Sequence, residues 1–396
     1  MEPIAIEDIS SDVYVGPFHE KQRALGGTFY EDYGTLWTAT FGDPVSEYWS
    51  VRRDVGLWDT YALVKFHLTG RDTLLALDRL FTRRLTGAEP GVVRYGMLLD
   101  EQGLMLDEAT VVVVSSEEAY LFGNDQRAGF TGHMAAQTAG MDLNIEDVSR
   151  AIPSLAVQGP RSFDVLSKLT DTDFGSLRWF RCLPAPIEIA GVRGLLVRAG
   201  FTGELGYEFY LLDGDDGAEG LWDAVAGAGA APIGLDAIEK LRIEAGLLIA
   251  EEDYWPGETD PLDLGMERFI DFDDHDFVGR DAVKERVEDP PRRFVTLALE
   301  GEMAPEHGAP VEIGGTTVGD VRSADTTPRF GALALAVVDA AHAAPGGEVD
   351  VGGFTGRVHP LPIDDPEKLR PRSDPRDPVT AHHRTGVVWG SLKPSL

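Results

Sequence analysis

Hydrophobic and polar positions follow a helical spacing early in the chain. Val45, Tyr48, Trp49 and Arg52 recur three and four residues apart, which predicts a helix over 44–53. A second helix is expected at 72–80, and short strand-like runs are expected at 63–68, 93–99 and 110–114. This mixture of short strands and helices predicts an α+β unit.

The middle of the chain continues the mixture without regular strand–helix–strand spacing. Strand-like runs are expected at 154–158, 186–189, 192–197 and 208–212, and helices at 162–169, 217–226 and 234–250. The polar, proline-bearing stretch 288–293 is typical of a linker. Glycines and short β runs dominate after it, which predicts a small β-rich C-terminal domain at 294–396. At 396 residues the chain is long enough for two or three domains.

The net charge of the chain indicates which classes of partner it can bind. The formal net charge is −32, and a surface field this negative repels nucleic acid and anionic lipid, so we expect neither nucleic-acid nor membrane binding. The chain has 7 lysines against 28 arginines. An acidic, lysine-poor protein suits molar salt, where the screening length of roughly 3 Å removes self-repulsion. We interpret the chain as halophilic, and an acidic mesophilic enzyme is the alternative.

The cysteine content and the N-terminal residues indicate the cellular compartment and bear on whether a metal site is expected. Cys182 is the only cysteine, which excludes an internal disulfide and a cysteine-rich zinc site. Residues 1–8 lack the basic and apolar regions of a signal peptide, and no run approaches a membrane span. We therefore expect a cytoplasmic protein, and we assign no metal site.

A glycine turn between two strand-like runs offers the clearest binding chemistry. Gly200, Gly203 and Gly206 allow close backbone approach, and Glu208 opens the second strand, where its side chain can project into a cleft. A carboxylate presents two acceptors in one plane, which matches a planar heterocycle with two adjacent N–H donors, such as the pyrimidine edge of a pterin. A surface hairpin is the alternative interpretation.

Arg242 lies in the middle of the apolar stripe of the helix expected at 234–250. A buried arginine must be paired, because an uncompensated buried charge is strongly destabilising. The residues leave two roles open: an internal salt bridge that joins helix to sheet, or contact with a ligand.

Two acidic residues, Asp107 and Glu108, stand at the start of the strand expected at 110–114. Consecutive strand side chains face opposite sides, so only one of the two can point into a site. An acidic turn is the alternative.

Five motifs, in order, resemble the folate-dependent aminomethyltransferase family, typified by the T-protein of the glycine cleavage system. The stretch 201–208, FTGELGYE, is similar to the family's YTGExGxE, and 241–246, LRIEAG, to its LRLEAG. The others are AVQGP at 156–160, VRRDVGLWD at 51–59 and FVGRDA at 277–282. The resemblance runs through most of the chain.

The resemblance implies an α+β protein of three domains in a cloverleaf ring, with tetrahydrofolate in a central channel. A discontinuous folate-binding domain would comprise 1–60 and 147–287, with an inserted domain at 61–146. By the same resemblance, Glu208 would bind the pterin edge, Tyr95 and Phe201 would line the pocket, and Trp179 would lie near it.

Two departures concern the chemistry. The family's pattern at the acidic strand is Asp-Asp, with the second the essential acid, whereas Glu108 stands here, and Ile238 matches the family's arginine in GLGARD. A misplacement of about 1 Å can reduce a rate on the order of 10²-fold. Asp107 and Glu108 are the catalytic candidates.

Further details resemble the branch that contains dimethylsulfoniopropionate demethylase, among them PIDDP at 362–366. The hypothesis is therefore a transferase that moves a methyl group from a small N-, S- or O-methylated donor to tetrahydrofolate. An aromatic or acidic wall would hold a cationic donor, with Trp58, Tyr61, Trp255 and Glu108 as candidates. The alternatives are a T-protein that accepts an aminomethyl group from a lipoylated carrier protein, and a folate-binding protein without turnover.

Overall fold

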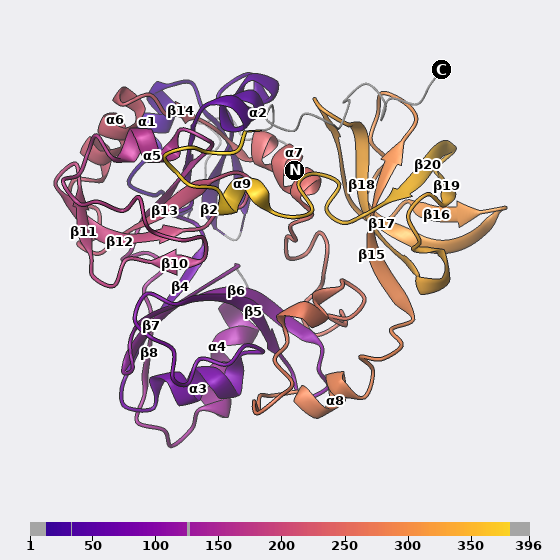
Figure 1. Ribbon diagram of the computed structural model, residues 1–396, viewed down its shortest axis with the longest axis horizontal. Helices are drawn as coiled ribbons and strands as arrows, with labels where there is room; N and C mark the ends of the chain where they lie inside the picture. The colour runs from indigo at the N-terminus through magenta and orange to yellow at the C-terminus, as the bar shows by residue number, and fades with distance from the viewer. Residues whose placement is uncertain (1–12, 33, 125–126, 381–396) are drawn as a thin grey trace.

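The computed structural model describes residues 13–32, 34–124 and 127–380. Figure 1 shows three lobes around a common centre, with the first lobe and the barrel joined by helix α7 (Leu235–Ala245). The expected α+β class and the expected arrangement in three lobes are confirmed (Figure 1). The expected domain boundaries stay a prediction.

The first lobe is built on a seven-stranded sheet with the strand order β10-β12-β13-β9-β3-β14, and β11 pairs with β12. Its central strand β13 is antiparallel to both neighbours. The strands are β3 (Gly56–Asp59), β9 (Ser154–Gln158), β10 (Arg181–Cys182), β11 (Ile187–Ile189), β12 (Val192–Arg198), β13 (Gly206–Leu211) and β14 (Ala231–Pro232). Because β3 precedes the second lobe in the chain and β9 follows it, the first lobe is discontinuous in sequence.

Helices cover both faces of this sheet. One face packs on α5 (Ser162–Leu166) and α6 (Ala218–Gly227), which bury Trp222 against the strands. The other face packs partly on α2 (Pro44–Arg53) and α7 around Tyr48 and Leu241. A short helix, α1 (His19–Ala24), and a two-stranded hairpin, β1 (Thr28–Asp32) and β2 (Thr35–Thr40), precede α2.

The second lobe is a five-stranded sheet with the order β5-β6-β7-β4-β8. Its strands are β4 (Val64–Thr69), β5 (Val93–Leu99), β6 (Met105–Ser115), β7 (Glu118–Gly123) and β8 (Asn144–Asp147). Helices α3 (Thr73–Leu80) and α4 (Arg127–Gln137) contribute apolar residues to the core on one face. The other face meets the first sheet, where Phe122 stacks on Tyr210 with ring centroids 4.0 Å apart.

The third lobe is a closed six-stranded barrel in the order β15-β18-β17-β16-β19-β20. Its strands are β15 (Arg292–Leu299), β16 (Pro310–Ile313), β17 (Thr316–Thr327), β18 (Gly331–Asp339), β19 (Glu348–Val351) and β20 (Phe354–His359). Short helices lie before it, between β18 and β19, and after it: η2 (Met266–Phe269), α8 (Arg280–Lys284), η3 (Ala340–His342) and α9 (Leu369–Arg372). The β-rich C-terminal region expected from the sequence is therefore a barrel.

One helix is shorter than expected. The apolar stripe predicts a helix to residue 250, but α7 ends at Ala245. Gly246 adopts a left-handed conformation with φ of 62°, and the amide of Leu247 donates to the carbonyl of Arg242. Glycine enters this conformation without a Cβ penalty, so it ends the helix although apolar residues continue the pattern.

Candidate functional site

Glu208 lies in the central strand of the first sheet, in register with Ala156 on one side and Val197 on the other. Trp58 is the partner of Ala156 in the next strand, so Trp58, Ala156 and Glu208 form one lateral row on the same face. The small side chain of Ala156 separates the indole of Trp58 from the carboxylate of Glu208 in this row.

The polar groups of this row are only partly satisfied. Tyr210 donates a hydrogen bond of 2.7 Å to Oε2 of Glu208, and burial raises the pKa of Glu208. Nε1 of Trp58 is buried and has no hydrogen-bond partner among the described residues. Phe201 is half-buried at the end of the row and packs against the cluster that contains Trp58. A flat heterocycle with N–H donors and a ring acceptor fits these groups.

The two acidic residues of β6 point in opposite directions. Glu108 shares a face with Tyr95 and Phe122, which is the face that meets the first sheet. The hydroxyl of Tyr95 donates to Oε2 of Glu108. Burial raises the pKa of Glu108 to about 8, so this carboxyl is mostly protonated at neutral pH and can itself donate a proton.

Asp107 is held on the opposite face by four hydrogen-bond donors, one of which is the backbone amide of Glu108 at 2.9 Å. Its Oδ1 accepts from the hydroxyl of Tyr254 at 2.8 Å and from Nδ2 of Asn124 at 3.0 Å, and its Oδ2 accepts from the backbone amide of Asn124 at 3.0 Å. Burial raises its pKa to about 6, and these hydrogen bonds oppose the rise. Of the two catalytic candidates, Glu108 is the one that faces Tyr95 and the first sheet, and Asp107 anchors the strand.

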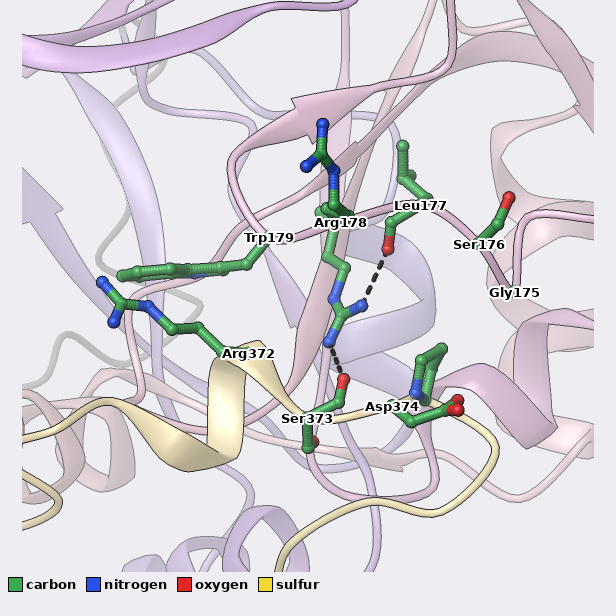
Figure 2. A pocket seen from close by; sticks show the side chains of 10 residues that line it. Gly175, Ser176, Leu177, Arg178, Trp179, Arg372, Ser373 and Asp374 are labelled. Atoms are coloured by element: carbon green, nitrogen blue, oxygen red, sulfur yellow. Dashed lines mark hydrogen bonds between the residues drawn. The ribbon is translucent and has the colours of Figure 1, made fainter.

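Trp179 lies apart from the row, in the loop before β10 at the edge of the sheet. The guanidinium of Arg372 sits over its indole, 4.8 Å from the ring centroid (Figure 2). Trp179 lines a surface cavity of about 420 Å³ between this loop and the segment 372–375. The structure therefore brings Tyr95 to Glu108 and Phe201 to the row of Glu208, but places Trp179 at a separate edge.

Arg242 is fully buried, and its contacts are those of the internal salt bridge. Its guanidinium donates to Glu239, to Asp253 at 2.6 Å and to the hydroxyl of Ser323 at 2.6 Å. Ser323 belongs to β17, so the pair joins α7 to the barrel. The sequence-based requirement that Arg242 be paired is confirmed, and every guanidinium nitrogen already has an internal acceptor.

The motifs that carry the family resemblance meet in a second buried cluster, which we call the motif network. Arg52 donates to Glu204 at 2.8 Å and to Glu244 at 2.7 Å. Its charged members are Arg52, Arg329, Arg370, Glu204, Glu244 and Asp364. They come from α2, the glycine turn, α7, the barrel and the segment after it. Much of the resemblance therefore rests on residues that hold the lobes together.

Sequence reasoning missed three residues beside the acidic candidates. Tyr210 follows Glu208 by two positions in one strand, so strand alternation alone places both on one face and could have found it. Asn124 and Tyr254 contact Asp107 although they lie 17 and 147 positions away in the sequence. No local sequence pattern predicts such contacts.

Two family models match the chain. The GCVT N-terminal domain covers residues 18–274, and the glycine cleavage T-protein C-terminal barrel domain covers residues 292–366. Within the part of the chain that the structure describes, no helix has the length and apolar character needed to cross a membrane.

Relatives and a solved structure agree with these matches. An aminomethyltransferase of Streptomyces coelicolor is 35% identical over 84% of this chain and 91% of its own length. A trimethylamine-oxide aldolase of Ruegeria pomeroyi is 33% identical over 90% of this chain and 48% of its own length. The crystal structure of the glycine cleavage system aminomethyltransferase T from Bartonella henselae superposes with a TM-score of 0.81 at 24% identity, covering 89% of this chain and 98% of that chain.

Proposed function

Because the chain belongs to the glycine cleavage T-protein family of folate-dependent transferases, we propose that it moves a methyl group from a small N-, S- or O-methylated donor to tetrahydrofolate. The observation that carries the proposal is the row of Trp58, Ala156 and Glu208 on one face of the first sheet. It combines a carboxylate acceptor, the small side chain of Ala156 and, among the described residues, an indole N–H without a hydrogen-bond partner.

The residues of the row fit tetrahydrofolate. Glu208 would accept hydrogen bonds from the N–H donors of the pterin, and Nε1 of Trp58 would donate to a pterin acceptor. Burial of Glu208 strengthens such bonds, because a charge-assisted hydrogen bond gains in a low-dielectric site. Bound tetrahydrofolate would supply the nitrogen nucleophile.

Transfer of a methyl group from an onium donor needs little acid catalysis. In transfer from an onium donor, a bond forms from the folate nitrogen to the methyl carbon while the bond from that carbon to sulfur or nitrogen breaks. The electron pair leaves with the neutral sulfide or amine, and the methylated folate nitrogen then releases its proton to give the neutral product. The protein must chiefly align the two partners and exclude competing solvent.

Two of the aromatic residues that are candidates for binding a cationic donor already contact a cationic side chain of this chain. Arg322 lies over the ring of Trp255 at 5.0 Å, and Nζ of Lys65 lies 5.8 Å from the ring of Tyr61. Trp58 is the candidate that remains beside Glu208. The similarity to trimethylamine-oxide aldolase over 90% of the chain supports a small methylated donor.

A second candidate is transfer of an aminomethyl group from a lipoylated carrier protein. The raised pKa of Glu108 favours it, because a protonated carboxyl near neutral pH can serve as the acid that assists departure of an amine leaving group. The aminomethyltransferase relatives support it as well. A folate-binding protein without turnover is the third candidate.

One assay separates the three candidates. The protein is incubated with tetrahydrofolate and a panel of onium donors, or with an aminomethylated carrier protein, in low and in molar KCl. Formation of 5-methyltetrahydrofolate with release of the demethylated donor supports the proposal. Methylenetetrahydrofolate and ammonia from the carrier indicate the T-protein reaction, and folate binding with neither product indicates the accessory role. Absence of folate binding in both salts would overturn all three.

A further inference from the structure

Lys65 is a fully buried cation in β4, at the junction of the first two lobes. Its side chain is 0% exposed. A lysine is almost never buried completely unless its ammonium group is bound, because removal of the charge from water is costly. Nζ of Lys65 donates to the backbone carbonyl oxygens of Tyr61 and Leu63, each at 2.9 Å. Carbonyl oxygens fix the position of an ammonium group and leave its charge in place.

The strand register directs Lys65 toward the first sheet. Lys65 is the register partner of Phe122 in β7, so the two side chains share one face of the second sheet. Phe122 stacks on Tyr210 of the first sheet with ring centroids 4.0 Å apart, and Tyr210 donates to Glu208 at 2.7 Å. Lys65 and Glu208 therefore lie on the two sheet faces that meet between the lobes, and the stack of Phe122 on Tyr210 joins these faces.

The groups that act on Glu208 come from both sheets. Burial has the largest influence and raises the pKa of Glu208, whereas the hydrogen bond from Tyr210 and the positive charge of Lys65 lower it. The side chains that the neighbouring strands place in the row of Glu208 do not ionise; they are Val197, Ala156 and Trp58. Among the residues that the structure describes, Lys65 is therefore the cation that opposes the effect of burial on this carboxyl.

The protonation state of Glu208 decides what it can bind. A carboxylate offers two acceptor oxygens to two N–H donors, whereas a protonated carboxyl uses one oxygen as a donor. Burial favours the protonated form, and a nearby cation favours the carboxylate. A direct ion pair, such as that between Arg52 and Glu244 in the motif network, would occupy an oxygen that the ligand needs. An ammonium group held by carbonyl groups supplies the charge and leaves the oxygens to the ligand.

We propose that Lys65 is a positioning residue of the candidate pterin site: its buried ammonium group, fixed by the carbonyl groups of Tyr61 and Leu63, holds Glu208 in the carboxylate form that accepts the N–H donors of the ligand. Lys65 acts through Glu208 rather than through contact with the ligand. This assignment rests on the proposed function, since it requires a folate at Glu208.

The test measures tetrahydrofolate affinity against pH by isothermal titration calorimetry on the full chain. In the wild type the affinity should fall as the pH is lowered, because Glu208 takes up a proton. Lys65→Gln keeps N–H donors for the two carbonyl groups and removes the charge. The midpoint of the fall should therefore move up by about one pH unit, which weakens binding about tenfold below both midpoints. Above both midpoints the two affinities should agree within about twofold, a recovery that damage to the fold would not give.

Two further variants separate charge from packing. Lys65→Arg keeps the positive charge and should return the midpoint toward the wild-type value. In a Glu208→Gln background the side chain at 208 cannot ionise, so Lys65→Gln should change the affinity by less than about twofold at every pH. Lys65→Met is the charge-free variant for the same comparison if Lys65→Gln fails to fold, because its unbranched side chain fills more of the space.

Lys368→Gln is the matched control. Nζ of Lys368 also donates to a backbone carbonyl, that of Ala245 at 3.0 Å, and the side chain is half-buried. The substitution removes the same charge and the same kind of contact, but Lys368 does not contribute to the raised or lowered pKa of Glu208. The pH midpoint of folate binding should therefore stay at the wild-type value.

Each outcome decides the assignment. A midpoint that rises without the charge, returns with Lys65→Arg and is insensitive to Lys65 in the Glu208→Gln background supports it. An unchanged midpoint, an equal shift in Lys368→Gln, or the same weakening at every pH would overturn this inference and leave the proposed function standing. An effect of Lys65→Gln that persists in the Glu208→Gln background would make Lys65 a direct ligand contact instead. Absence of folate binding by the wild type at every pH would overturn the proposed function and this inference together.

Discussion

Two regions of this protein bury acidic side chains with different numbers of cations around them. In the motif network, the guanidiniums of Arg52, Arg370 and Arg329 hold the pKa of Asp364 well below its usual range, whereas burial outweighs Arg370 and Arg52 at Glu204 and raises its pKa. On the facing sheets, Glu208 and Glu108 have raised pKa values because burial is not fully offset by a cation. Paired carboxylates hold the lobes together, and unpaired ones are available to a ligand.

The largest effect is expected where a charge pair is broken. Glu244→Gln removes a fully buried partner of Arg52, and it should lower the free energy of unfolding by about 3–5 kcal/mol, because the guanidinium stays buried. Urea denaturation followed by circular dichroism measures this. Glu188→Gln, at an exposed carboxylate of β11, is the control and should change stability by less than about 0.5 kcal/mol. Equal effects of the two substitutions would remove the distinction between the groups.

The next effect concerns binding rather than stability. Glu208→Ala should weaken tetrahydrofolate binding at least about tenfold, equivalent to about 1.4 kcal/mol, because the acceptor for the pterin N–H donors is lost. Calorimetric titration measures the affinity. Its unfolding free energy should change less than that of Glu244→Gln, since no described ion pair is broken. Unchanged folate affinity would refute the assignment of Glu208.

A third effect depends on pH. Glu108→Gln should reduce turnover about tenfold while folate affinity stays within about twofold. Wild-type activity that uses the protonated carboxyl should fall as pH rises through about 8. A bell-shaped or alkaline-limited profile that persists unchanged in the variant would assign the titration to another group.

The pH dependence of the unfolding free energy tests the raised pKa of Glu108 independently of activity. Its pKa is about 8 in the folded chain against the ordinary value of 4.5, so the folded state favours the protonated form. This contribution is fully present below pH 4.5 and is lost as pH rises toward 8. Glu108→Gln cannot ionise, so it should be more stable than the wild type by about 1–3 kcal/mol near pH 9, and not below pH 4.5. Matching denaturation curves across this range would contradict the buried position of Glu108.

The smallest effect tests the orientation of Glu208. Tyr210→Phe keeps the stack on Phe122 and removes the 2.7 Å hydrogen bond to Glu208. Folate affinity should fall about two- to threefold, because Tyr210 acts on the ligand only by orienting Glu208. A loss as large as that of Glu208→Ala would make Tyr210 a direct ligand contact.

Local pattern predicted much of the secondary structure. The helix at 44–53 and the strands at 93–99 and 154–158 have the bounds expected from the sequence. The helix carries its own signal because one of its faces is buried, whereas the strand at 154–158 is buried on both faces and is recognised as a short apolar run. The helix expected to reach 250 ended early because a backbone conformation at Gly246 outweighed the apolar pattern.

The site was less accessible to sequence reasoning. The prediction that only one of Asp107 and Glu108 points into a site rests on strand alternation, which is local and can be inferred from the sequence. Which of them faces the first sheet depended on the register between β5 and β6 and on Tyr254, more than a hundred positions away. The cavity beside Trp179 also joins distant segments, around 178 and 372, and neither segment has a pattern that points to the other.

The motif network also limits how this chain can be divided. Asp364 and Arg370 lie after the last barrel strand, yet they complete ion pairs with Arg52 and Glu204 in the first lobe. A fragment cut at the linker before β15 would separate Asp364 from Arg52 and Arg370 from Glu204, and so would break the ion pairs that join the first lobe to the segment after the barrel. The three lobes are therefore distinct in the architecture but are not independently folding modules. An exchange of barrels between relatives would have to include the segment after the last barrel strand, which contains Asp364 and Arg370.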